Sequence, residues 1–124
     1  MADQQSCSCS SGPKLIFACS GAADVGEIAD RAARKMSREG AGKMFCLVGI
    51  GGRVPGIIKS TEAAAAILAI DGCPLNCARN CLEQASFRDF QHLQLADLGM
   101  EKGKTPPTQE NIERAAAKGR EMLT

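Results

Sequence analysis

Aromatic residues are scarce in this 124-residue chain, which contains no Trp, no Tyr and only four Phe. Proteins that bind single-stranded nucleic acids usually stack the bases on aromatic rings, so the composition argues against that function. The chain also lacks an excess of either charge, since 15 basic and 14 acidic residues leave a formal net charge of +1. Without a basic block, nothing in the sequence favours a polyanion or an anionic membrane as a partner.

Long apolar segments are missing as well. No apolar run reaches the ~18 residues that a membrane-spanning helix needs. The first residues, MADQQSCSCSSGPK, have neither the positive start nor the apolar core of a secretory signal peptide. We therefore expect a cytoplasmic protein with no membrane partner. Residues 1–13 are predicted to be a flexible tail, and residues 14–124 a single domain.

Short apolar runs do alternate with amphipathic segments along this domain. Four runs predict buried strands, at residues 15–19, 44–50, 67–71 and 92–99. Each is followed by a predicted helix: from Asp24 to a stop at Gly40, at 54–64, from Pro74 to about Ser86, and after a cap at Thr108. This order predicts an α/β fold of three αβα layers, with a small parallel, Rossmann- or flavodoxin-like sheet of about four strands.

Cysteine is abundant, with seven in the chain. In a cytoplasmic protein, cysteines bind metals or react more often than they form disulfides, and an odd number also argues against full pairing. Three of them, Cys73, Cys77 and Cys81, lie in the segment IDGCPLNCARNC. Each also has a simpler interpretation, because free cysteine is among the most buried residue types and often only packs.

Topology predicts that some of these thiols converge. Cys19 ends the first predicted strand and Cys73 follows the third, so both are expected at the carboxyl edge of the sheet, where thiolates on adjacent strands could share a zinc ion. If Pro74 opens the next helix, Cys73 caps it and Cys77 lies one turn further, facing the same ion. Cys46 reaches the edge only if its strand ends before the predicted limit.

Several motifs together resemble a known family. The segments IDGCPLNC, FACSGAADVGEIADRAARKM and MFCLVGIGGRVPGIIKS are similar to the DGC-domain family of proposed zinc-binding proteins, named after the triplet Asp71-Gly72-Cys73. The similarity runs from Lys14 to Gly99 and beyond. It implies that four cysteines are zinc ligands, and it implies no role for Cys7, Cys9 or Cys81. The implied ligands are Cys19, Cys46, Cys73 and Cys77.

Three functions are compatible with these observations. The first is a metal-binding protein with zinc as its cofactor, the second a redox or sulfur-transfer enzyme with Cys73 activated at a helix N-terminus, and the third an iron–sulfur or other soft-metal protein. Whether the protein is an enzyme stays open. Asp71 is expected to cap a helix and His92 to be a surface or packing residue. Residues 49–56 are expected to form a simple glycine turn, with a lip of the site that uses Arg53 as an anion contact as the alternative.

Overall fold

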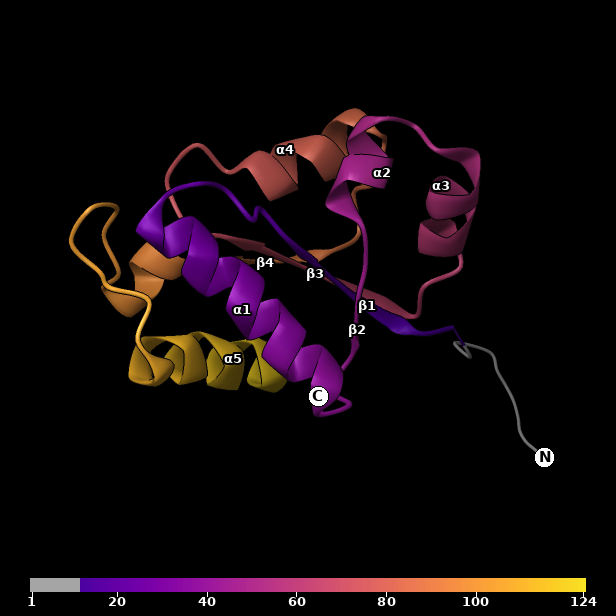
Figure 1. The fold of residues 1–124 in the computed structure, drawn as a ribbon. Coiled ribbons are helices and arrows are strands. Elements are labelled where there is room, and N and C mark those ends of the chain that lie inside the picture. Colours follow the sequence, from indigo (N-terminus) through magenta and orange to yellow (C-terminus); the bar gives the residue numbers. More distant parts are fainter. Residues whose placement is uncertain (1–11) are drawn as a thin grey trace.

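The computed structural model of the chain describes residues 12–124, so most of the predicted tail, with Cys7 and Cys9, lies outside the described residues. The centre of the fold is one sheet of four parallel strands in the order β2-β1-β3-β4 (Figure 1). This confirms the predicted parallel α/β class. The strands are β1 (Lys14–Ala18), β2 (Lys43–Met44), β3 (Ala66–Asp71) and β4 (Gln91–Gln94).

Helices cover both faces of the sheet, as the three-layer prediction requires (Figure 1). One face carries α1 (Asp24–Arg38) and α5 (Gln109–Leu123). The other carries α2 (Leu47–Gly51), α3 (Pro55–Glu62) and α4 (Cys77–Gln84), and a short 3₁₀ helix, η1 (Leu95–Leu98), follows β4. Within residues 12–124, none of the helices is long and apolar enough to cross a bilayer.

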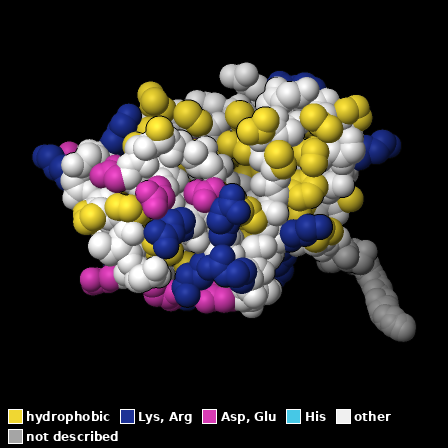
Figure 2. Space-filling view, in the orientation of Figure 1, with side chains coloured by type: hydrophobic (Ala, Val, Ile, Leu, Met, Phe, Trp, Pro, Cys, Tyr) yellow, Lys and Arg dark blue, Asp and Glu magenta, His cyan; other side chains and the backbone are white. Residues whose placement is uncertain are grey.

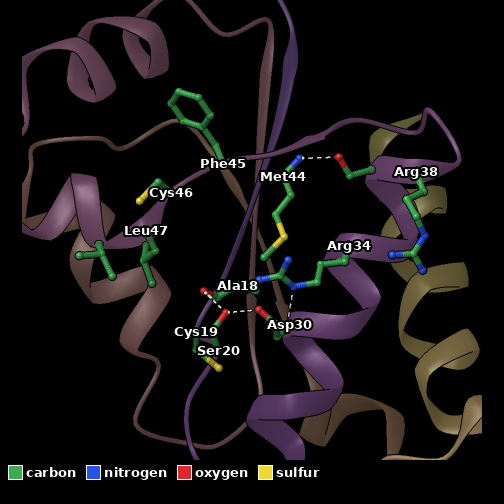
Figure 3. A pocket seen from close by; sticks show the side chains of 12 residues that line it. Ala18, Cys19, Ser20, Asp30, Arg34, Arg38, Met44, Phe45, Cys46 and Leu47 are labelled. Atoms are coloured by element: carbon green, nitrogen blue, oxygen red, sulfur yellow. Dashed lines mark hydrogen bonds and ion pairs between the residues drawn. The ribbon is translucent and has the colours of Figure 1, made fainter.

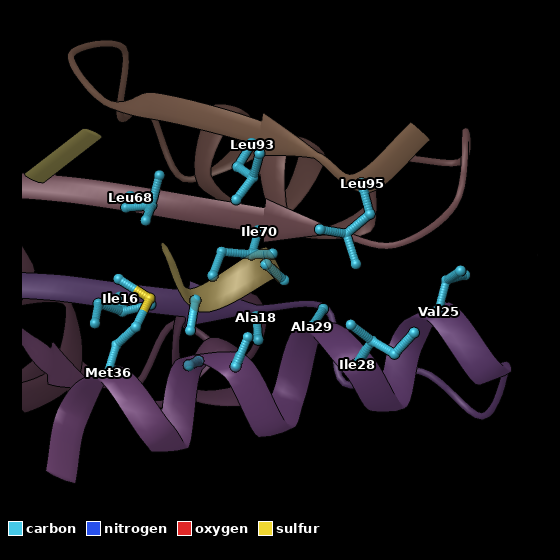
Figure 4. Packing of buried hydrophobic residues seen from close by; sticks show 14 of the residues in the cluster. Ile16, Ala18, Val25, Ile28, Ala29, Met36, Leu68, Ile70, Leu93 and Leu95 are labelled. Carbon is cyan, nitrogen blue, oxygen red and sulfur yellow. The ribbon is translucent and has the colours of Figure 1, made fainter. Parts of the chain in front are cut away.

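The core lies in two parts because successive residues of a strand point to opposite faces. On one face, Ile16 and Ile70 meet Ile28 and Met36 of α1, all fully buried (Figure 4). On the other face, Phe17 of β1 is buried in a second cluster that includes residues of α2 and α4. The sheet is therefore covered on both sides, which explains the continuous apolar runs in its sequence.

The structure overturns the predicted strand at 44–50. Only Lys43–Met44 belongs to β2, and the apolar residues that follow form the short helix α2. Periodicity cannot separate a strand from a buried helix in so short an apolar run. Packing decides the outcome, because a Cβ atom at Gly49 would lie only 2.7 Å from Ile57, so α2 lies directly against α3.

Two further boundaries differ from the prediction. The strand expected at 92–99 ends at Gln94, whose side chain accepts a hydrogen bond from the Ala96 amide and so starts η1 instead. The helix expected from Pro74 begins only at Cys77, because Asn76 adopts a left-handed conformation (φ 54°). By contrast, the cap at Thr108 is confirmed, since its hydroxyl accepts a hydrogen bond from the Asn111 amide at 3.2 Å.

Candidate functional site

The site lies at the topological switch point of the sheet, where successive connections lead to opposite sides of β1. The connection after β1 leads to β2 on one side, and the connection after β2 returns to β3 on the other side of β1. Parallel α/β proteins bind ligands at the carboxyl ends of the two strands that flank such a switch point. Cys19 follows β1 directly, its amide donates to the Ile70 carbonyl of β3 at 3.0 Å, and Cys73 lies two residues beyond β3. The predicted placement of both cysteines at one edge of adjacent strands is confirmed.

Three thiols share one cavity at this point. A pocket of about 470 Å³ is lined by Cys19, Cys73 and Cys77 together with Asp71 and Lys102. We call it the thiol pocket. Its cysteines come from the end of β1, the end of β3 and the first residue of α4, so only the folded chain brings them together.

Asp71 lines this pocket and fixes the start of α4 through its carboxylate. Its carboxylate is 1% exposed and accepts hydrogen bonds from the amides of Ala78 (2.7 Å) and Arg79 (3.0 Å) in the first turn of α4. The expected helix-capping role is therefore confirmed, although the cap acts from the preceding strand. The same carboxylate contacts His92 Nε2 at 2.8 Å. The expectation that His92 is only a surface or packing residue was wrong.

Gly72 allows the strand end to approach α1. A Cβ atom at this position would lie 2.4 Å from the Val25 carbonyl oxygen and 2.9 Å from the Gly26 nitrogen, distances that no side chain tolerates. Glycine is therefore required for β3 to pass the first turn of α1. The three consecutive residues of the triplet therefore have three different roles. Asp71 caps α4, Gly72 allows the backbone to approach α1, and Cys73 places a thiol in the pocket.

The start of α4 differs from the prediction for Cys73. Because the helix begins at Cys77, Cys73 is not its cap and lies four residues before its first turn. The intervening turn is held by the side chain of Gln94. Its Nε2 donates to the Cys73 carbonyl at 3.0 Å and to Asn76 Oδ1 at 2.7 Å. Cys77, not Cys73, is the thiol at the helix N-terminus.

The environment of Cys77 disfavours its thiolate. Desolvation by the neighbouring groups raises the pKa of the Cys77 thiol, and the negative charges of Asp71, Cys19, Cys73 and Cys81 raise it further. Cys77 itself is exposed at the start of α4. Because these groups repel one another when charged, a bound cation would stabilise all of them.

Cys46 lies apart from the other predicted ligands. It is the exposed N-cap of α2, where its sulfur accepts a hydrogen bond from the Gly49 amide at 3.3 Å. Its strand does end early, but Met44 pairs with Ile16, so β2 stops two residues before β1 does. Cys46 lines a second pocket, of about 700 Å³, which it shares with Cys19. Figure 3 shows that the two sulfur atoms do not point at one another across it.

Comparison with known proteins identifies the relatives of this chain. The DGC domain matches residues 15–118. The chain belongs to the DGC-domain family. It is also 36% identical over 88 residues to a Pseudomonas aeruginosa PAO1 protein named "Anaerobic and virulence modulator AnvM", covering 71% of this chain and 67% of that protein. No solved structure matches the chain.

The sulfur atoms of the thiol pocket suit a soft metal ion, but their arrangement in this structure does not enclose one. Cysteine thiolates bind zinc and other soft ions. Within residues 12–124, however, no three Cys, His, Asp or Glu side chains are placed to hold one ion together. Cys81 packs into the second core cluster, 3.7 Å from the position of a Cβ atom at Gly51.

Arg53 and Ser20 have partners that the sequence did not predict. The Arg53 guanidinium donates to the carbonyls of Ile50 (2.8 Å) and Gln84 (2.9 Å), so it joins α2 to α4 instead of facing an anion. The Ser20 hydroxyl donates to Asp30 at 2.7 Å, and Asp30 also binds Arg34 Nε at 2.8 Å. The i,i+4 spacing of the latter pair was a usable signal, whereas the link to Ser20 depends on the fold.

Proposed function

We propose that this DGC-family protein binds a soft divalent metal ion, with zinc as the first candidate, at the carboxyl edge of its sheet. The observation that supports this most strongly is the thiol pocket, in which Cys19, Cys73 and Cys77 from three separate elements line one cavity. Desolvation raises the pKa of the Cys77 thiol, and the charges of Asp71 and of the neighbouring thiols raise it further. A divalent cation would stabilise these thiolates.

The proposed ligands are the three pocket thiols, with Cys46 as the fourth. Binding requires the pocket thiols to turn toward a common point, because no three ligating side chains within residues 12–124 are placed to hold one ion. Cys46 must also give up its hydrogen bond with the Gly49 amide and move with the start of α2. We therefore propose a site that the ion completes, with the three pocket thiols as its permanent part and Cys46 as the mobile one.

A set of four thiolates leaves no open position for a substrate or a water molecule. A structural, carrier or sensing role therefore suits this site better than hydrolysis. The name of the P. aeruginosa relative describes a modulator, which agrees with a non-catalytic role. Free thiols and thiolate-bound zinc are also stable in a reducing compartment, and we accordingly place the protein in the cytoplasm.

The thiol-enzyme alternative has less support. It required Cys73 at a helix N-terminus, where the backbone amides favour a reactive thiolate. The helix instead begins at Cys77, whose pKa is raised rather than lowered. An iron–sulfur cluster would use the same ligands, and it differs from zinc by its brown colour after anaerobic purification.

Metal content tests the proposal. Protein purified anaerobically, loaded with Zn²⁺ and desalted is expected to retain about one zinc per chain by elemental analysis and native mass spectrometry. Cys73→Ser is expected to lose the metal. Cys81→Ser, which removes a thiol of α4 that does not line the thiol pocket, is the matched control and is expected to keep it. Retention below about half an equivalent in the wild type, or equal retention by the two variants, contradicts the proposal.

A further inference from the structure

The second pocket has a lining quite unlike that of the thiol pocket. It is larger, about 700 Å³, which lies within the ~300–1,000 Å³ typical of small-molecule sites. Its floor is apolar, formed in part by Ala18, Met44 and Leu47, and Val48 at its rim is 83% exposed. Lys and Arg side chains over α1 lie beside a band of hydrophobic side chains over α2 and α3 (Figure 2). The second pocket lies between these two zones.

The guanidinium of Arg34 projects into this pocket while it is paired with Asp30 (Figure 3). Arg34 Nε donates to Asp30 Oδ2 at 2.8 Å, and the Ser20 hydroxyl donates to the other oxygen of Asp30 at 2.7 Å. The three side chains form a chain of hydrogen bonds from the end of β1 to α1 (Figure 3). Both Nη groups of Arg34 have no partner within residues 12–124, and Figure 3 shows the guanidinium directed toward Met44 and Ala18. Its planar fork of donors is the geometry that binds carboxylate, sulfonate and phosphate groups.

The charge balance of the pocket is positive. Asp30 is the one acidic side chain that lines it, and it already compensates Arg34. Arg38 also lines the pocket and has no acidic partner within residues 12–124. The lining as a whole therefore has one more positive than negative side chain, which is complementary to a molecule with one negative charge and an apolar body.

The geometry points to a second ligand site: the pocket between α1 and the segment Met44–Val48 binds a small organic monoanion with an apolar body. The anionic group lies on the Arg34 fork, and the apolar part covers Met44 and Leu47. Cys19 and Cys46 line the same pocket, so the ligand would lie against two of the family's cysteines. This inference does not require a bound metal and goes beyond the proposed function.

Two fluorescent probes with the same skeleton test the charge dependence. 8-Anilinonaphthalene-1-sulfonate carries an anionic sulfonate on an apolar body, and N-phenyl-1-naphthylamine lacks the sulfonate. The sulfonate probe is expected to bind saturably with one probe per chain. Arg34→Gln is expected to weaken its binding by at least about threefold, the effect of a partly exposed ion pair, and to leave binding of the neutral probe unchanged.

Arg31→Gln is the matched control. It removes the same charge one turn earlier on α1, from a residue that does not line the second pocket, and it is expected to leave both affinities unchanged. Both substitutions break only exposed ion pairs, so the fold should persist, which the melting temperature verifies. The inference is overturned if the sulfonate probe does not saturate, if the two variants weaken it equally, or if Arg34→Gln weakens the neutral probe to the same extent.

Discussion

The ends of β2 and β3 lie on either side of β1, and they are built in opposite ways. At the end of β3, Asp71 is buried and Gly72 is pressed against α1, so Cys73 has a fixed position. At the end of β2, the strand has only two residues and Cys46 is exposed at the start of a five-residue helix. One edge of one sheet thus combines a closely packed half and an exposed half.

The two halves also differ in charge. The thiol pocket on the β3 side gathers three thiols with Asp71 and Lys102, whereas the second pocket on the β2 side has two guanidinium groups and one carboxylate from α1. Cys19 lines both pockets, since it follows the central strand β1. We therefore expect different ligands on the two sides, a cation on the closely packed β3 side and an organic anion on the exposed β2 side, with Cys19 between them.

The largest expected effect on stability comes from Gly72→Ala, which tests the close packing of the β3 side against α1. Its Cβ atom would meet the Val25 backbone at 2.4 Å, and relief requires displacement of the strand end or of α1. We expect a loss on the order of 3 kcal/mol in the free energy of unfolding, measured by urea denaturation. Gly56→Ala is the control, because nothing lies within 4 Å of its Cβ position in α3. There we expect a gain of about 0.5 kcal/mol, and equal effects at both sites would contradict the account.

Asp71→Ala follows in size. The substitution leaves the amides of Ala78 and Arg79 without their buried acceptor, which is expected to cost about 2 kcal/mol of unfolding free energy. Asp89→Ala, at an exposed residue, provides the matched loss of a carboxylate and should change stability by less than about 0.5 kcal/mol. A similar small effect for Asp71 would mean that the triplet does not hold α4 in place.

The two halves are expected to contribute unequally to metal binding. Cys19→Ser removes a thiol of the thiol pocket, and we expect it to abolish zinc retention. Cys46→Ser removes the mobile ligand, and we expect a weaker site, with affinity lowered about tenfold or more but still measurable by competition with a chelator. If Cys46→Ser lowers zinc affinity more than Cys19→Ser does, the assignment of the thiol pocket as the main part of the metal site is wrong.

The smallest effect concerns Asp24, which ties the first turn of α1 to the loop after η1. Hydrogen bonds from the backbone, led by the Gly103 amide and with Thr105 contributing, lower the pKa of the Asp24 carboxyl below 3.8. A lowered folded-state pKa stabilises the protein above pH 3.8, and this contribution is lost as the pH falls through the folded value. Asp24→Asn is therefore expected to reduce the stability difference between pH 7 and pH 3, measured by denaturation at both values, with Asp89→Asn as control.

Residues with local signals were predictable from the sequence. α1 and α5 have clear helical periodicity, and β1 and β3 are apolar runs with defined ends. The topology rules for parallel sheets then placed Cys19 and Cys73 together without any knowledge of contacts. Asp71 was recognised as a cap because a carboxylate before a helix usually is one.

The remaining features depend on contacts between distant segments. The helix at Leu47–Gly51 follows from the packing of Gly49 against Ile57, which an apolar run alone does not reveal. The contact between Asp71 and His92 spans 21 residues, and the chain from Ser20 through Asp30 to Arg34 requires β1 and α1 to be in place. Which cysteine faces which pocket was therefore beyond prediction.

The most direct test of the metal proposal is X-ray absorption at the zinc edge of the zinc-loaded protein. The account predicts a sulfur shell around zinc at about 2.3 Å with at least three scatterers. The Cys73→Ser protein is expected to lose its zinc, and the Cys81→Ser protein is expected to keep zinc with an unchanged sulfur shell. A shell of nitrogen and oxygen only, or the same sulfur shell in both variants, would contradict the account.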